Sequence, residues 1–150
     1  MRPQQTPIGL HLTRVARDVG RAFDAAMADV GGSLPVWLIL LNLKVTAGTS
    51  QRRLAAHVGI REATLTHHLN SLEKQGLITR ERDPDNRRTH VVALTGAGEA
   101  AFRRFRDVAV DVDRRRRRGL TADQVSALAA ALDRLDGNVS SSDSKGGIRS

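Results

Sequence analysis

Residues 61–75 include polar side chains that could form hydrogen bonds to the bases of DNA. On a helical wheel centred on Leu65, the residues on the opposite side are Thr64, His67, Ser71 and Lys74. Their hydroxyl, imidazole and ammonium groups can donate hydrogen bonds to base edges in the major groove, or accept them. Arg61, at the start of the stretch, could reach a phosphate or a guanine. An ordinary solvated helix has a similar face, so this face alone does not identify a DNA-binding protein.

A basic turn follows this polar stretch. Residues 83–88, DPDNRR, contain Asp, Pro and Asn, which favour a turn, and end in Arg87 and Arg88. The flanking residues 77–82 and 89–94 have extended character, most clearly in the β-branched second stretch. Together they predict a β-hairpin with a basic tip, from which an arginine can enter the minor groove of DNA. Because the hairpin directly follows the polar helix, the combination favours DNA binding over a solvated turn.

A dinucleotide-binding pattern is also present in the chain. Residues 96–101, GAGEAA, match G-x-G-x-x-A. A nucleotide-binding fold needs a further strand and an acidic residue about 20 positions on, whereas here the helix continues into five arginines and then another helix. A helix start capped by Thr95, with Glu99 in its first turn, explains these residues more simply.

Metal sites and enzymatic activity have no support in the sequence. The five histidines form no H-E-x-x-H pair, and the adjacent His67 and His68 point about 100° apart on a helix. The chain has no cysteine, which excludes zinc fingers, iron-sulfur sites, thiol nucleophiles and a cysteine redox switch. No phosphate loop or nucleophile elbow occurs. We therefore expect a protein that is not an enzyme and has neither cofactor nor metal.

The elements that would position the polar face form a helix-turn-helix. Residues 51–57 and 62–75 are predicted to be a short and a longer helix, separated by a turn in which Gly59 can adopt a positive φ. The apolar residues that would pack the two helices together are Leu54, Val58, Ile60, Leu65, Leu69 and Leu72. In such a pair the second helix enters the major groove. With the hairpin, this predicts a winged helix-turn-helix over about residues 35–94.

Long helices with apolar stripes flank this module at residues 8–30, 97–118 and 121–136. Another apolar helix, at 35–45, follows a cap at Ser33 and contains Trp37. The three stripes need a partner, and a second copy of the chain would give the two-fold symmetry of a palindromic operator with half-sites about 10 base pairs apart. A monomeric helical bundle remains the alternative.

The whole sequence therefore predicts one mainly α unit at residues 8–137, a winged helix-turn-helix with a small β-hairpin wing and a helical dimerisation layer. We expect residues 1–7 to be flexible and the Ser/Gly-rich residues 138–150 to be a disordered tail. The longest apolar run, residues 36–41, is too short to span a membrane, and no signal peptide is visible. These features predict a cytoplasmic protein with no membrane partner.

A net charge of +8 and a pI near 11.4 indicate a polyanionic partner. The excess lies in the middle of the chain, with +3 over residues 49–94 and +4 over residues 95–118. The arginine run at 114–118 could be a second DNA site. We favour a structural role for this run, because cations complement a helix carboxyl end and Asp107, Asp111 and Asp113 lie nearby.

Residues 54–99 strongly resemble the MarR family of winged-helix regulators, with LAAHVGI, TLTHHLNSLEKQGLITRERDPDNRR and ALTGAGE in the family's order. The resemblance implies an acidic-x-Arg element in the wing, here Asp85 and Arg87, in which the aspartate supports an arginine that contacts DNA. It also implies a dimer whose first and last helices intertwine. The residues that it places on or beside the recognition helix are Arg61, Thr64, Thr66, His67 and His68. Glu62 and the two histidines are not fixed in the family.

The sequence-based hypothesis is a dimeric repressor that binds double-stranded DNA specifically and is released by a small molecule. By the resemblance, a small aromatic or phenolic acid would bind between the dimer layer and the winged domain. Such a ligand needs an apolar wall and a cation, which Trp37 with His11 or Arg14 could supply, although a tryptophan in an apolar helix is more often core. Two alternatives remain: a non-specific architectural DNA-binding protein and a winged helix that binds another protein.

Overall fold

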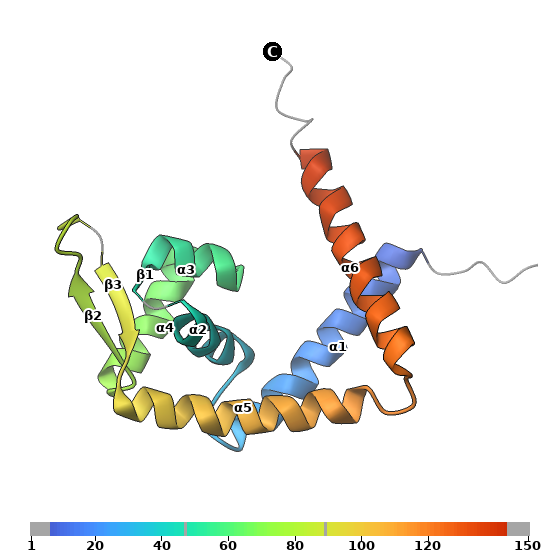
Figure 1. Cartoon of the computed structure of the whole chain (residues 1–150), viewed down its shortest axis with the longest axis horizontal. Helices are drawn as coiled ribbons and strands as arrows, with labels where there is room; N and C mark the ends of the chain where they lie inside the picture. The colour runs from blue at the N-terminus through green and yellow to red at the C-terminus, as the bar shows by residue number, and fades with distance from the viewer. Residues whose placement is uncertain (1–6, 47, 89, 144–150) are drawn as a thin grey trace, which may run out of the picture. The chain divides into compact units, whose positions relative to one another are not determined.

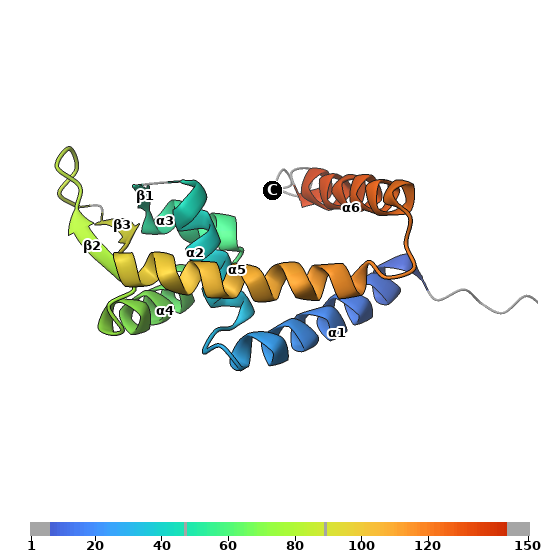
Figure 2. The same ribbon diagram turned by 60° about the horizontal axis from the view of Figure 1, so that its bottom comes forward.

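The structure is a computed structural model, and it describes residues 7–46, 48–88 and 90–143 (Figures 1 and 2). Its elements are α1 (Ile8–Ala28), α2 (Leu34–Val45), β1 (Thr49–Ser50), α3 (Gln51–Val58), α4 (Glu62–Lys74), β2 (Ile78–Arg82), β3 (His90–Leu94), α5 (Gly96–Arg116) and α6 (Ala122–Asp143). This confirms the mainly α fold class. The chain divides into two compact units after Val112. In the part that the structure describes, no helix is long and apolar enough to cross a membrane.

The core of the first unit lies where α2, α3 and α4 meet the small sheet and α5. Leu40, Leu54 and Leu65 are fully buried, one from each of the three helices. Trp37 of α2 stacks on Phe102 of α5, with 5.4 Å between ring centroids and 14° between ring planes. The tryptophan is therefore a core residue, as most tryptophans in apolar helices are.

Local capping explains where the helices of the winged module begin and end. The Ser33 hydroxyl accepts a hydrogen bond from Val36 N at 3.4 Å, which confirms the predicted cap of α2, and Asp24 of α1 accepts a second one from Leu34 N at 2.6 Å. The turn after α3 has Gly59 at φ 76°, as predicted. Glycine adopts this left-handed conformation without strain, so Gly59 allows the chain to turn sharply between α3 and α4.

The wing is a hairpin of β2 and β3, in register from Ile78 opposite Leu94 to Arg82 opposite His90. The sheet has a third strand, β1, which pairs Thr49 with Val92 and gives the order β1-β3-β2. The sequence analysis did not predict β1 at Thr49–Ser50. Two residues carry no periodic pattern, and the strand forms because β3 has an open edge to pair with. Ala47 and Thr89 lie outside the described residues.

The carboxyl end of the helical part of the chain differs from the sequence prediction. The expected disordered tail at 138–150 was wrong at its start, since α6 continues to Asp143; residues 144–150 and residues 1–6 lie outside the described part. Extending an existing helix adds one backbone hydrogen bond per residue, and serine and asparagine cost only about 0.5 kcal/mol each relative to alanine. The Ser141 hydroxyl also donates to the Asn138 carbonyl at 3.0 Å. The other helix ends lie within two residues of the predicted ones, and several coincide with them.

Candidate nucleic-acid interface

Helix α4 exposes the polar face that the sequence predicts. Leu65, Leu69 and Leu72 are buried against the core, which turns the opposite side of the helix to solvent. The predicted contact residues that are exposed on or before this helix are Arg61, Thr64, His67, Ser71 and Lys74. Arg61 is the N-cap residue in an extended conformation, next to the positive end of the helix dipole. This end of α4 is therefore suited to a phosphate.

Two predicted contact residues, Thr66 and His68, are only half exposed. The Thr66 hydroxyl donates to the Glu62 carbonyl at 2.9 Å, so its remaining capacity is as an acceptor. Burial lowers the pKa of His68 below its ordinary 6.5, and the nearby His67 lowers this pKa further. His68 is therefore mainly neutral at pH 7, with one donor and one acceptor nitrogen.

The tip of the wing is shaped by two side-chain-to-backbone hydrogen bonds. Asp85 N donates to Asp83 Oδ1 at 2.9 Å, and Arg88 N donates to Asn86 Oδ1 at 3.2 Å. Such turns form locally and leave the following side chains outside, and Arg87 and Arg88 are both exposed. Among the described residues of the wing, the Asp85 carboxylate forms no ion pair with Arg87. Its supporting role stays a prediction.

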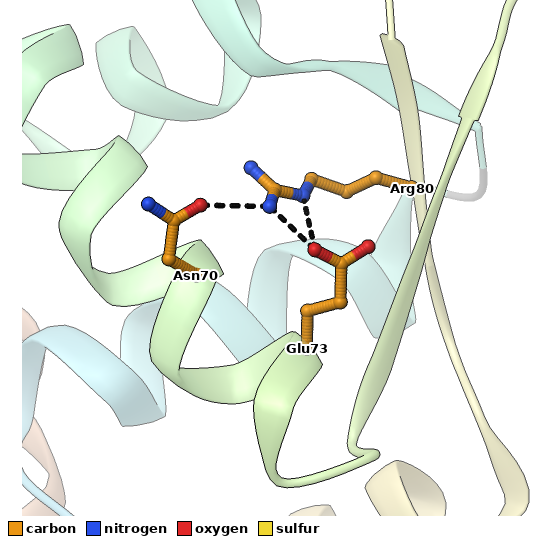
Figure 3. Close-up of polar contacts among 3 residues, drawn as sticks. All are labelled: Asn70, Glu73 and Arg80. Atoms are coloured by element: carbon orange, nitrogen blue, oxygen red, sulfur yellow. Dashed lines mark hydrogen bonds and ion pairs between the residues drawn. The ribbon is translucent and has the colours of Figure 1, made fainter.

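Arg80 of β2 links the wing to the recognition helix, and the sequence analysis missed this residue. Its Nε and Nη2 donate to Glu73 Oε2 of α4 at 3.1 and 2.5 Å, and Nη2 also donates to Asn70 Oδ1 at 2.7 Å (Figure 3). Its side chain is 19% exposed. The hydrogen bonds from Arg80 lower the pKa of Glu73 below its ordinary 4.5, so this carboxylate stays ionised at neutral pH. The three side chains form a fixed contact between strand and helix.

An open depression of about 260 Å³ adjoins this contact and is lined by Gln51, Glu73, Arg80 and His90. Its lining lacks the apolar wall that an aromatic ligand needs. The residues predicted for such a ligand lie elsewhere. Within the described residues, no group of three or more histidines, aspartates and glutamates could hold a metal ion.

The three predicted effector residues lie on two helices, two of them on α1 and Trp37 on α2. Arg14 Nη2 lies 3.4 Å from His11 Nδ1 near the start of α1, and both residues are exposed. The core that contains Trp37 is reached by Phe23 of the same helix, twelve residues after His11, which is about 18 Å along a helix axis. His11 therefore lies well before the part of α1 that meets the core, and a pocket shared with Trp37 stays a prediction.

Residues 96–101, which match the dinucleotide-binding pattern, attach α5 to the rest of the winged module. Thr95 Oγ1 accepts a hydrogen bond from Gly98 N at 3.0 Å and donates one to the Gly76 carbonyl at 2.6 Å. A Cβ atom at Gly98 would lie 1.9 Å from the Leu77 carbonyl oxygen. The glycine thus allows two backbones to approach closely, and the threonine caps the helix and ties it to the turn before β2.

The arginine run at the end of α5 forms at least one ion pair, between Arg117 in the turn after the helix and Asp113 in its last turns. Arg117 Nε lies 2.8 Å from Asp113 Oδ2, four residues earlier. Such a pair, next to three further arginines in the last turn of the helix, agrees with the structural role that we favour for the run.

Comparisons with known proteins agree on one family. The model of the MarR family matches residues 33–90. The transcriptional repressor CouR of Rhodococcus jostii RHA1, bound to a 23-mer DNA duplex, is 29% identical, with a TM-score of 0.81 over 87% of this chain and 92% of that one. CouR bound to p-coumaroyl-CoA matches at 27% identity and TM-score 0.77, over 87% and 91%. A mutant MarR from E. coli with operator DNA, at 22% identity and TM-score 0.79 over 86% and 93%, shares the fold.

Proposed function

Because the chain belongs to the MarR family of winged helix-turn-helix transcription regulators, we propose that it is a homodimeric repressor, not an enzyme, that binds a palindromic operator. The observation that carries the proposal is the exposed polar face of α4 beside a wing with Arg87 and Arg88 at its tip. The similar repressor CouR has been solved on a DNA duplex. The recognition helices would occupy successive major grooves, while the wings reach the flanking minor grooves. Such a repressor acts in the cytoplasm, where bacterial DNA lies.

The dimer is supported by apolar side chains that the single chain leaves exposed. On α1 these include Val15 and Val19, which are 40% and 41% exposed, and on α6 they include Leu128 and Leu132. Apolar stripes of this length are normally buried against a partner. A second copy would cover them and set the distance between the two recognition helices.

Arg87→Ala should weaken binding to the operator by about 1–3 kcal/mol, while the dimer stays intact. The guanidinium at the wing tip is exposed and makes no hydrogen bond to the residues that the structure describes, so its removal should affect DNA binding and not the fold. Operator affinity is measured by fluorescence anisotropy at fixed salt. Arg103→Ala on α5 removes the same charge outside the wing and α4 and serves as the matched control.

Equal affinities of wild type and Arg87→Ala would remove the wing from the mechanism. Footprinting on genomic fragments separates the two remaining alternatives. An architectural protein covers the DNA uniformly and a repressor protects a palindrome, whereas a protein-interaction module binds no duplex even at low salt.

The effector that we propose is a small aromatic or phenolic acid or its thioester, because CouR has also been solved with p-coumaroyl-CoA. Adding p-coumaroyl-CoA to the operator complex should release the chain. His11 and Arg14 would bind the anionic part of the ligand, whereas Trp37 is committed to the core on its Phe102 side. Arg14→Ala should weaken the effect of the ligand about tenfold without changing operator affinity.

The matched control is Arg21→Ala, on the same helix, because Arg21 already pairs with Asp18. If p-coumaroyl-CoA, free cinnamic acids and other phenolic acids all left the protein bound to its operator, this class of effector would be rejected.

A further inference from the structure

The amide of Asn70 has a fixed orientation. Its Oδ1 atom lies 2.7 Å from Nη2 of Arg80. A guanidinium carries only donors, so the atom that faces it must be the amide oxygen and not the nitrogen. The nitrogen, with its two N–H groups, points away from Arg80 (Figure 3). Asn70 is exposed and lies five residues after the buried Leu65, about 140° around the helix, on the polar face of α4.

Arg80 cannot easily follow a rotation of this amide, because it is held at both ends. Its backbone belongs to β2, opposite Val92 of β3, and two of its nitrogens donate to Glu73 Oε2. A flipped Asn70 amide would bring its N–H groups against the N–H groups of Arg80. The strand and the carboxylate together therefore select one of the two amide orientations.

We infer that Asn70 reads a base in the major groove and that Arg80 sets its polarity, so that the amide acts as a hydrogen-bond donor. Guanine fits best, because its N7 and O6 are both acceptors, whereas thymine offers only O4 and adenine only N7. Adenine is recognised by an amide that donates and accepts at once, which a held oxygen disfavours. This inference rests on the proposed function, because it requires α4 to lie in the major groove. Arg80 is a positioning residue here and Asn70 the contact.

The test uses duplexes that the full-length dimer selects from a random pool, together with all single base-pair variants of the best duplex. At one position in each half-site, wild type should prefer guanine about five- to tenfold over adenine. Asn70→Ala should remove this preference and leave the ranking at other positions unchanged. Asn70→Asp keeps an oxygen for Arg80 but loses the donors, so the preference should move to a base with an amino group, such as cytosine.

The role of Arg80 is tested by the same ranking. Arg80→Ala releases the amide oxygen, so adenine should gain at that position, and Arg80→Lys, which restores a donor, should recover part of the wild-type preference. Gln75→Ala is the matched control: it removes another amide from the end of α4, one whose nitrogen donates to Ser71 instead, and should leave the ranking intact. Circular dichroism verifies that each variant is folded, and light scattering verifies that it is a dimer. If Arg80→Ala does not fold, the Asn70 variants alone test the inference.

Each outcome of the selection is decisive. An Asn70→Ala protein with the wild-type ranking at every position, or with an equal loss on all duplexes as expected for a phosphate contact, overturns the inference but keeps the proposed function. A wild-type chain that enriches no duplex overturns both.

Discussion

Gly98→Ala should destabilise the folded chain by about 3 kcal/mol or more. The added Cβ would lie 1.9 Å from the carbonyl oxygen of Leu77 and 3.0 Å from its carbonyl carbon. Both atoms belong to the backbone of the turn before β2, so a side-chain rotation cannot relieve the overlap. Overpacking against movable side chains already costs about 1–3 kcal/mol, and here α5 must move relative to the wing. Urea unfolding at fixed protein concentration measures the effect.

Gly96→Ala provides the control, because it makes the same change two residues earlier. No atom lies within 4 Å of a Cβ at Gly96, and its φ is not in the left-handed region. This variant should unfold at nearly the wild-type urea concentration. If the two variants had the same midpoint, the close approach of α5 to Leu77 would not be a feature of the folded protein in solution.

The sequence predicted those parts of the molecule that depend on neighbouring residues. The buried side of α4 follows from the spacing of Leu65, Leu69 and Leu72, and the opposite face is exposed as a geometric consequence. Ser33 and Gly59 have the cap and turn conformations that their chemistry favours. Local patterns of this kind are complete within about ten residues, so they can be recognised without the fold.

The features that were missed depend on contacts between distant residues. β1 exists only because β3 lies beside it, and the reason for Gly98 is the carbonyl of Leu77. Arg80 looks like an ordinary strand arginine until the hairpin folds against α4, where Glu73 and Asn70 are its partners. The only sequence signal for this contact is a pattern: an amide and an acidic residue three positions apart on a helix, followed by a strand that contains an arginine.

The predicted effector residues show the limit of an argument from residue type. The sequence indicates that Trp37 belongs to an apolar helix, but not which element covers it, and in the structure Phe102 of α5 does so. His11 and Arg14 were grouped with Trp37 by residue type alone. In the structure α1 extends for 21 residues and its buried residues, Phe23 and Met27, lie in its second half, so the grouping stays a prediction.

The double substitution Leu128→Asp and Leu132→Asp should convert the dimer into a folded monomer. The two leucines lie four residues apart on one face of α6 and are 52% and 39% exposed in the single chain, so charges there do little harm to the monomer. In an interface each aspartate would have to be buried without a partner, which is strongly unfavourable. Light scattering measures the mass in solution. Ser126→Asp with Ala130→Asp adds the same charges about 160–200° around the helix from Leu128 and should leave the dimer intact.

Operator affinity should fall in the same double variant by about 100-fold or more, although no residue near the DNA has changed. A dimer on a palindrome gains because its second recognition helix binds as part of the same particle, an effect of about 10²–10⁴ in affinity. A monomer keeps only one half-site. If the variant stayed dimeric, the interface would have to lie on other helices, such as α1 with its exposed Val15 and Val19. If it became monomeric but kept wild-type affinity, two-fold recognition itself would be wrong, since paired half-sites could not then be the source of binding strength.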